Sequence, residues 1–235
     1  MPNPETLEFY SAYVINVRDF ILAESEIRRA INRALKENKS ETVKVQTKVY
    51  ALLYSTFSEA NFMKMILTPY GFSQAYVEEI LKQGSVTEKW IKCLELAFLM
   101  HTKREKGSEV PNKMKELKDM INSFIVDPSL LRNKIAHGQL TIALNRKNTG
   151  LNKEATTLLE NLDFVTIQRW FKINKQLSSI VEDLIESPDS AHYRFYYPKY
   201  LELENYISRS NTWTTETKLT TISMRKGIKY KVKPE

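Results

Sequence analysis

The chain has few of the residues on which many catalytic and structural sites depend. It contains one cysteine, Cys93, together with three histidines and six glycines among its 235 residues. A single cysteine excludes an internal disulfide framework and indicates a reducing compartment, so we expect a cytoplasmic protein. No cysteine or histidine pair stands at ligand spacing and no acidic cluster follows a helix face. The sequence therefore predicts neither a metal site nor a cofactor.

Several common motifs and segments are also absent. The sequence has no G-x-x-x-x-G-K-[ST], G-x-G-x-x-G or G-x-S-x-G pattern, which argues against P-loop, dinucleotide-binding and α/β-hydrolase chemistry. No run approaches the roughly 20 apolar residues of a membrane span, and the first residues do not resemble a signal peptide. The net charge of +7 favours polyanionic partners such as RNA, although lysines on a solvated surface produce the same charge.

Apolar residues recur at spacings of three and four along most of the chain, which is the helical period. This pattern predicts an all-α protein, an up-and-down helical bundle over residues 1–187. Ser85 and Glu88 form a capping box at the start of one helix. We expect helices over residues 7–35, 41–67, 85–100, 114–125, 128–138 and 153–185.

Residues 188–235 form a separate aromatic and basic extension in this interpretation. A short helix is expected over 199–207. Strict alternation over 228–233 then predicts a strand, which pairs with 217–223 as a basic β-hairpin or remains an extended tail. Trp213 and Tyr230 are interleaved with lysines, a pattern compatible with base stacking on single-stranded RNA.

The most informative segment is Leu131-Arg132-Asn133-Lys134-Ile135-Ala136-His137-Gly138. Asp127 and Pro128 read as the N-cap and first residue of its helix, and the final glycine reads as the C-cap. Asn133 and His137 are four residues apart, so their Cβ atoms should lie roughly 5–6 Å apart on one face. The arginine lies about 140° round the helix from the histidine. A second copy of the motif, facing the first across a dimer axis, would close that gap.

Each residue of the segment also has a structural interpretation. His137 could simply complement the dipole at a helix C-terminus. Arg132 could form a surface ion pair, and Asn133 could hydrogen-bond locally to the backbone.

Glu59 is a further candidate for the catalytic site, because its spacing places it near the apolar stripe expected for the second helix. That stripe would comprise Val45, Val49, Leu52, Thr56, Met63 and Leu67. A buried carboxylate needs a cation or a water-filled cleft, since burying an unpaired charge costs several kcal/mol. We expect Arg132 to be its partner. The alternative is that Glu59 lies at the exposed edge of the stripe.

The pattern Arg-polar-x-x-x-His at residues 132–137, in a helical chain, resembles the signature of the HEPN superfamily. This resemblance implies a bundle of about four helices that forms a homodimer around the paired motifs. It also implies, for many members, a metal-independent endoribonuclease of toxin–antitoxin, abortive-infection or antiviral defence systems, with an antitoxin or other regulatory protein as a possible partner. Gln139 stands where some toxin members carry a tyrosine, so regulation through that tyrosine is not implied.

RNA strand scission needs a base for the 2′-hydroxyl, an acid for the 5′-oxygen and positive charge for the phosphorane. His137 is the expected base, with the copy in the second protomer as the acid. Arg132 would hold the phosphorane oxygens and Asn133 would orient the imidazole or the phosphate. The products would be a 2′,3′-cyclic phosphate and a 5′-hydroxyl. Further RNA contacts are predicted at Lys134, Arg225, Lys226, Lys229 and Lys231.

Two other functions fit the same sequence. The chain could be a non-catalytic HEPN-like module that binds RNA or a protein within a larger complex. It could also be the antitoxin or structural subunit of such a complex, docked through the basic tail from Ser208 onward.

Overall fold

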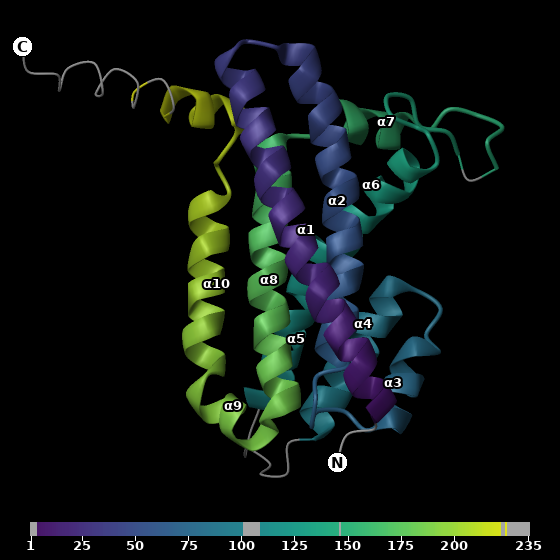
Figure 1. Cartoon of the computed structure of the whole chain (residues 1–235), viewed down its shortest axis with the longest axis vertical. Helices are drawn as coiled ribbons and strands as arrows, with labels where there is room; N and C mark the ends of the chain where they lie inside the picture. Colours follow the sequence, from purple (N-terminus) through teal and green to yellow (C-terminus); the bar gives the residue numbers. More distant parts are fainter. Residues whose placement is uncertain (1–3, 101–108, 146, 222–223, 225–235) are drawn as a thin grey trace, which may run out of the picture.

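The computed structural model shows an all-helical protein (Figure 1). It describes residues 4–100, 109–145, 147–221 and 224. These residues form α-helices α1 to α10, the π-helix η1 and a further helical segment over 215–221. They contain no strand, and their one extended pairing is the isolated bridge between Leu144 and Leu151. The predicted all-α class is confirmed.

The four longest helices make up the body of the bundle (Figure 1). Helices α1 (Pro4–Lys36) and α2 (Ser40–Ile66) run antiparallel and are joined by a tight turn in which Asn38 has a φ of 56°. Helix α8 (Phe164–Glu186) packs against α2, and α10 (Tyr196–Ser210) lies along α8. The shorter elements are α3 (Gln74–Leu81), α4 (Val86–Leu99), α5 (Glu109–Ile121), η1 (Asn122–Val126), α6 (Asp127–Ala136), α7 (Lys153–Glu160) and α9 (Pro188–Arg194).

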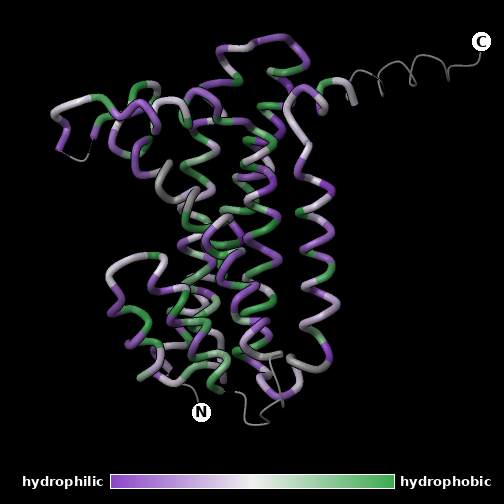
Figure 2. The backbone as a smooth tube through the Cα atoms, turned by 180° about the vertical axis from the view of Figure 1, so that it is seen from behind, coloured by the Kyte–Doolittle hydropathy of each residue, from purple (hydrophilic) through white to green (hydrophobic). Residues whose placement is uncertain are grey.

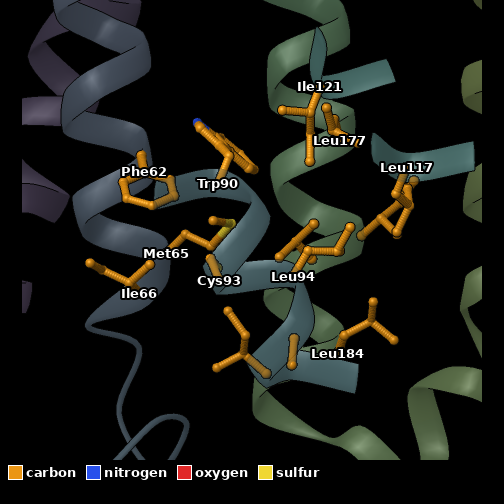
Figure 3. Packing of buried hydrophobic residues seen from close by; sticks show 14 of the residues in the cluster. Phe62, Met65, Ile66, Trp90, Cys93, Leu94, Leu117, Ile121, Leu177 and Leu184 are labelled. Carbon is orange, nitrogen blue, oxygen red and sulfur yellow. The ribbon is translucent and has the colours of Figure 1, made fainter. Parts of the chain in front are cut away.

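Hydrophobic and hydrophilic stretches alternate along the long helices (Figure 2), as expected where each helix buries one face. The buried residues form two clusters. The lower core lies at the end of the bundle that holds α3, α4 and α9 (Figure 1), and its centre is drawn in Figure 3. There the rings of Phe62 and Trp90 pack with their centroids 4.9 Å apart. Its other central side chains are Met65, Ile66, Cys93, Leu94, Leu117, Ile121, Leu177 and Leu184.

The upper core fills the other end of the bundle and centres on a group of aromatic rings. Tyr50 and Phe57 of α2 contact the ring of Phe171 from α8, with centroids 5.0 and 5.2 Å from it. The Tyr50 hydroxyl donates to the Glu24 carboxylate at 2.8 Å, and Arg28 lies 3.2 Å from the same carboxylate. Burial, followed by the nearby Glu24, raises the pKa of Tyr50 well above its usual value. Tyr50, Glu24 and Arg28 therefore form a polar triad at the edge of this core, in which the arginine side chain reaches the surface.

A second polar contact lies where the two cores meet. The Asn61 amide donates to the Asn174 side-chain oxygen at 3.0 Å, and the Asn174 amide donates to the Ser58 hydroxyl at 2.9 Å. Both asparagines are buried. Because buried amides are costly without partners, these bonds fix α2 against α8 at this level.

The predicted extent of α2 is confirmed, but the face expected to be buried is wrong. Val45 and Val49 are exposed at 61% and 47%, whereas Tyr50, Tyr54 and Phe57 are almost fully buried. Helix α2 contacts α1, α6 and α8, so its orientation is set by the residues that remove most apolar surface from water. Aromatic rings remove more than valines do.

The helix predicted over 153–185 is two helices. The chain breaks after Glu160, and Asp163 caps the start of α8 by accepting from the backbone N–H groups of Val165 and Thr166 at 2.7 and 3.1 Å. An aspartate side chain at this position competes with continued helix by bonding to the backbone itself. The predicted N-cap Ser85 of α4 is confirmed, with Glu88 N–H donating to the Ser85 hydroxyl at 3.2 Å. The second bond of the pair runs from the Ser85 hydroxyl to the Glu88 carboxylate at 2.9 Å, so the full capping box is not formed.

The region after residue 187 is mainly helical where it is described. Helices α9 and α10 pack on α8, and Tyr196 and Leu203 belong to the lower core. The division of the chain at residue 187 stays a prediction. The first arm of the predicted hairpin is wrong, because residues 215–221 are helical. The second arm and the predicted RNA contacts Arg225, Lys226, Lys229 and Lys231 lie outside the described residues.

Candidate active site at the end of helix α6

The helix that carries the Arg-polar-x-x-x-His segment continues directly from the one before it. Helix α5, the π-helix η1 and α6 follow each other without a break. Helix α6 begins at Asp127 as predicted, but Val126 before it already has helical φ and ψ, so the predicted N-cap at Asp127 is wrong. Pro128 has no N–H and cannot bond to the Phe124 carbonyl four residues earlier. The Tyr54 hydroxyl of α2 donates to that carbonyl at 2.6 Å instead. A bond from a neighbouring helix thus accommodates the proline.

The end of α6 has a defined geometry. Gly138 has a φ of +79°, its N–H donates to the Ile135 carbonyl at 3.0 Å, and the Gln139 N–H donates to the Lys134 carbonyl at 3.0 Å. This pair of bonds is a Schellman motif, and a residue at positive φ there is usually glycine. The prediction that Gly138 ends the helix is confirmed, and His137 is the C-cap residue.

Asn133 and His137 lie one helical turn apart on the surface. The His137 N–H donates to the Asn133 carbonyl at 3.2 Å, and both residues are exposed. The His137 imidazole has no hydrogen-bonding or ionic partner among the described residues. An imidazole that makes no structural contact is free to meet a ligand.

The backbone of Arg132 lies within α6, five residues before the histidine. Because α6 is α-helical up to Ala136, the two positions keep the separation of about 140° expected from the sequence. The Arg132 side chain lies outside the described residues, and so does its predicted ion pair with Glu59.

Glu59 is exposed on α2, so its predicted burial is wrong and the alternative, an exposed edge position, is what the structure shows. It lines a groove of about 470 Å³ between α1, α2 and α4, together with Tyr13 and Trp90. The end of α6 lies farther up α2, where the Lys48 ammonium donates to the Thr141 hydroxyl at 3.3 Å. Eleven residues of helix separate Lys48 from Glu59, roughly 16 Å. The structure does not bring Glu59 to His137.

Lys134 has a structural partner. Its ammonium donates to the Leu144 carbonyl at 2.6 Å, and the Gln139 side chain accepts from the Leu144 N–H at 2.8 Å. These bonds hold the loop after α6 against the helix. A direct contact of Lys134 with RNA stays a prediction.

The same loop and α7 expose apolar side chains that the sequence analysis did not single out. Four large residues of this region are 49–68% exposed: Leu140, Ile142, Leu151 and Leu158. Exposed apolar residues that gather in one part of a surface often mark an interaction site. The signal was present in the sequence as alternation at 140–144, but that pattern also fits a half-buried strand.

No protein-family model, curated protein or solved structure matches this chain. Among the described residues there is no cluster of three or more histidine, cysteine or acidic side chains that could hold a metal ion. In the same part of the chain no helix combines the length and apolar character needed to cross a bilayer.

Proposed function

We propose that the chain is a metal-independent endoribonuclease of HEPN type, with its active site at the end of α6. The observation that carries the proposal is the exposed His137 imidazole, without a partner among the described residues, one turn from Asn133 on a helix whose end is fixed by a Schellman motif. A histidine held in place by hydrogen bonds would have a carbonyl or carboxylate partner, whereas a histidine that only complements the helix dipole would have no role in cleavage.

In the proposed reaction the 2′-oxygen of RNA forms a bond to the adjacent phosphorus while the bond from phosphorus to the 5′-oxygen breaks. His137 accepts the proton of the 2′-hydroxyl, and the histidine of a second protomer donates one to the 5′-oxygen. Arg132 supplies charge to the phosphorane and Asn133 orients the reacting groups. DNA is not cut, because it lacks the 2′-hydroxyl.

A homodimer is part of the proposal because one α6 helix does not bring Arg132 and His137 to one side. The exposed Leu140 and Ile142 beside the motif support it, since apolar surface next to an incomplete site suits a second copy of the chain. A regulatory protein that covers this surface would restrain the activity.

The test is digestion of RNA in the presence of EDTA, with the ends of the fragments mapped. We expect His137→Ala and Arg132→Ala to reduce cleavage about 100-fold or more, the range for loss of a general base or a charge-stabilising group. The chain's two other histidines, His101 and His192, supply the matched controls. His101→Ala and His192→Ala should cut like the wild type. Thermal melting of His137→Ala should match the wild type, because the replaced side chain is exposed.

Cleavage that survives in His137→Ala would refute the proposal. A wild type that binds RNA or a protein but never cuts would establish the non-catalytic module instead. Fragments that end in a 3′-hydroxyl would also contradict the proposed chemistry, which leaves a cyclic phosphate.

A further inference from the structure

A second hollow lies on the other side of the bundle from α6, between α8, α10 and the helical segment 215–221. Figures 1 and 2 show α10 and α6 on opposite sides of the α1–α2 pair. The hollow has a volume of about 510 Å³, which is within the range of small-molecule sites. It is lined by Val165, Gln168, Arg169, Tyr206, Trp213, Thr214, Thr217, Lys218 and Thr221.

Two cations line this hollow, and no acidic residue does. The Lys218 ammonium donates to the Gln168 side-chain oxygen at 2.6 Å and lies 4.3 Å from the centre of the Phe164 ring. Arg169 donates to the Ser210 hydroxyl at 3.0 Å. In the described part of the chain, neither cation has a carboxylate within ion-pair distance.

The carboxylates nearest to Lys218 bond to other groups. Asp163 caps α8 with one oxygen and accepts from the Thr215 N–H and hydroxyl with the other, at 3.1 and 2.6 Å. Glu24 is held by Tyr50 and Arg28. Burial is the main cause of a lowered pKa at both cations, and it brings the pKa of Lys218 to about 8. An anion in the hollow would restore the missing counter-charge.

The wall of the hollow also offers aromatic surface. The Trp213 ring packs edge-on against Tyr206, with centroids 6.0 Å apart and planes at 89°. Trp213 is 47% exposed, so part of its ring remains open to a ligand. Planar bases stack on such rings whatever their identity.

We propose that this hollow binds a nucleotide, whose phosphate pairs with Arg169 and Lys218 and whose base stacks on Trp213. The nucleotide is either free or one unit of a single-stranded RNA. The inference stands on the residues of this hollow alone and goes beyond the ribonuclease activity proposed for the end of α6. Its failure would leave that proposal intact, and the reverse also holds.

The experiment titrates the full chain with AMP, GMP, UMP and CMP, and separately with the RNA hexamers A6 and U6, by tryptophan fluorescence and calorimetry. Adenosine and inorganic phosphate are run beside them. Mononucleotides contain no bond that a ribonuclease could cut, so binding is measured independently of cleavage. The variants are Trp213→Leu, Lys218→Met and Arg169→Gln, and Lys44→Met removes a charge elsewhere on the surface as the matched control.

We expect saturable binding that falls about tenfold or more in each of the three variants, as the loss of a stacking or charged contact predicts. Lys44→Met should bind like the wild type. If the mononucleotides bind and the three variants weaken that binding, the ligand is a free nucleotide. If only the hexamers bind in this way, the ligand is one unit of a single-stranded RNA. The proposal is overturned if no probe binds, if adenosine binds as tightly as AMP, or if folded variants bind unchanged. Trp213→Leu keeps the test valid should a cation variant fail to fold, because its ring is exposed.

Discussion

The two cores of the bundle differ in composition, and both candidate sites contact the upper one. The lower core consists mostly of aliphatic side chains, with four aromatic residues and the buried thiol of Cys93, whose pKa is raised by burial. The upper core centres on tyrosine and phenylalanine rings, and Tyr50 of that core donates to the Glu24 carboxylate. The helix that ends at His137 and the hollow at Lys218 both contact the upper core. The proposed sites therefore lie nearer the end of the bundle whose core carries a buried tyrosine–carboxylate contact.

The sharpest way to test this division is to make a cavity in the lower core. Leu177 is fully buried, so Leu177→Ala should lower the free energy of unfolding by about 3 kcal/mol. Leu99→Ala is the matched control, because Leu99 is 66% exposed and its loss should cost little. Urea unfolding measures both. Equal effects of the two substitutions would contradict the described core.

Substitution of two glycines, one beside the lower core and one at the end of α6, measures how tightly each region is packed. A Cβ atom at Gly71 would lie 2.5 Å from the Ile185 side chain, whereas one at Gly138 would meet nothing within 4 Å and would only suffer from the positive φ. We expect Gly71→Ala to cost about 2 kcal/mol and Gly138→Ala about 1 kcal/mol. Thermal melting with fitted unfolding enthalpies measures the difference. The opposite order would show that the lower half can relax around the added methyl group.

Removing one hydroxyl tests the polar triad of the upper core. Tyr50→Phe deletes the bond to Glu24 and should cost about 1.5 kcal/mol at pH 7, while the exposed Tyr70→Phe should cost almost nothing. The pKa of Tyr50 is raised above the usual 10. The stabilisation is therefore complete below pH 10 and is lost as the pH rises above it. Urea unfolding at pH 7 and pH 11 checks both parts.

The effect expected at Lys218 depends on pH. Burial lowers the pKa of Lys218 from 10.5 to about 8, so between these values the unfolded chain binds more protons than the folded one. The wild type should therefore gain stability relative to Lys218→Met as the pH rises from 8 to 10. The raised pKa values of Cys93 and the buried tyrosines act oppositely but in both proteins, so the difference isolates Lys218. If the difference in stability between the wild type and Lys218→Met did not change with pH, the Lys218 ammonium would be exposed to water and not buried.

Local signals in the sequence predicted most helix positions and several of their ends. Ser85 at the start of α4 and Gly138 just after the end of α6 act through hydrogen bonds to their own neighbours in the chain, which can be inferred from the sequence. Within the helix predicted over residues 7–35, Val14, Val17 and Ile31 follow the helical period of apolar residues. In the structure Val17 and Ile31 are buried, whereas Val14 is exposed.

Features that depend on distant partners could not be predicted. The buried face of α2 is decided by aromatic contacts with α8. The π-helix precedes Pro128, and the Phe124 carbonyl, to which the proline cannot donate, accepts a hydrogen bond from Tyr54 of α2. For the same reason the sequence drew attention to Trp213 but not to Arg169 and Lys218. Those two cations meet only because α8 and the segment 215–221 pack side by side.

The π-helix η1 determines which way the surface at the end of α6, with Asn133 and His137, faces. Its hydrogen bonds span five residues rather than four, so it contains one residue more than an α-helical turn. That residue rotates everything after it by about 100°. The direction in which His137 points is therefore set by a single insertion within 122–126. Deleting one residue there would rotate the intact motif away from its present face. A change of helical register could therefore remove the proposed site without altering any residue of the motif.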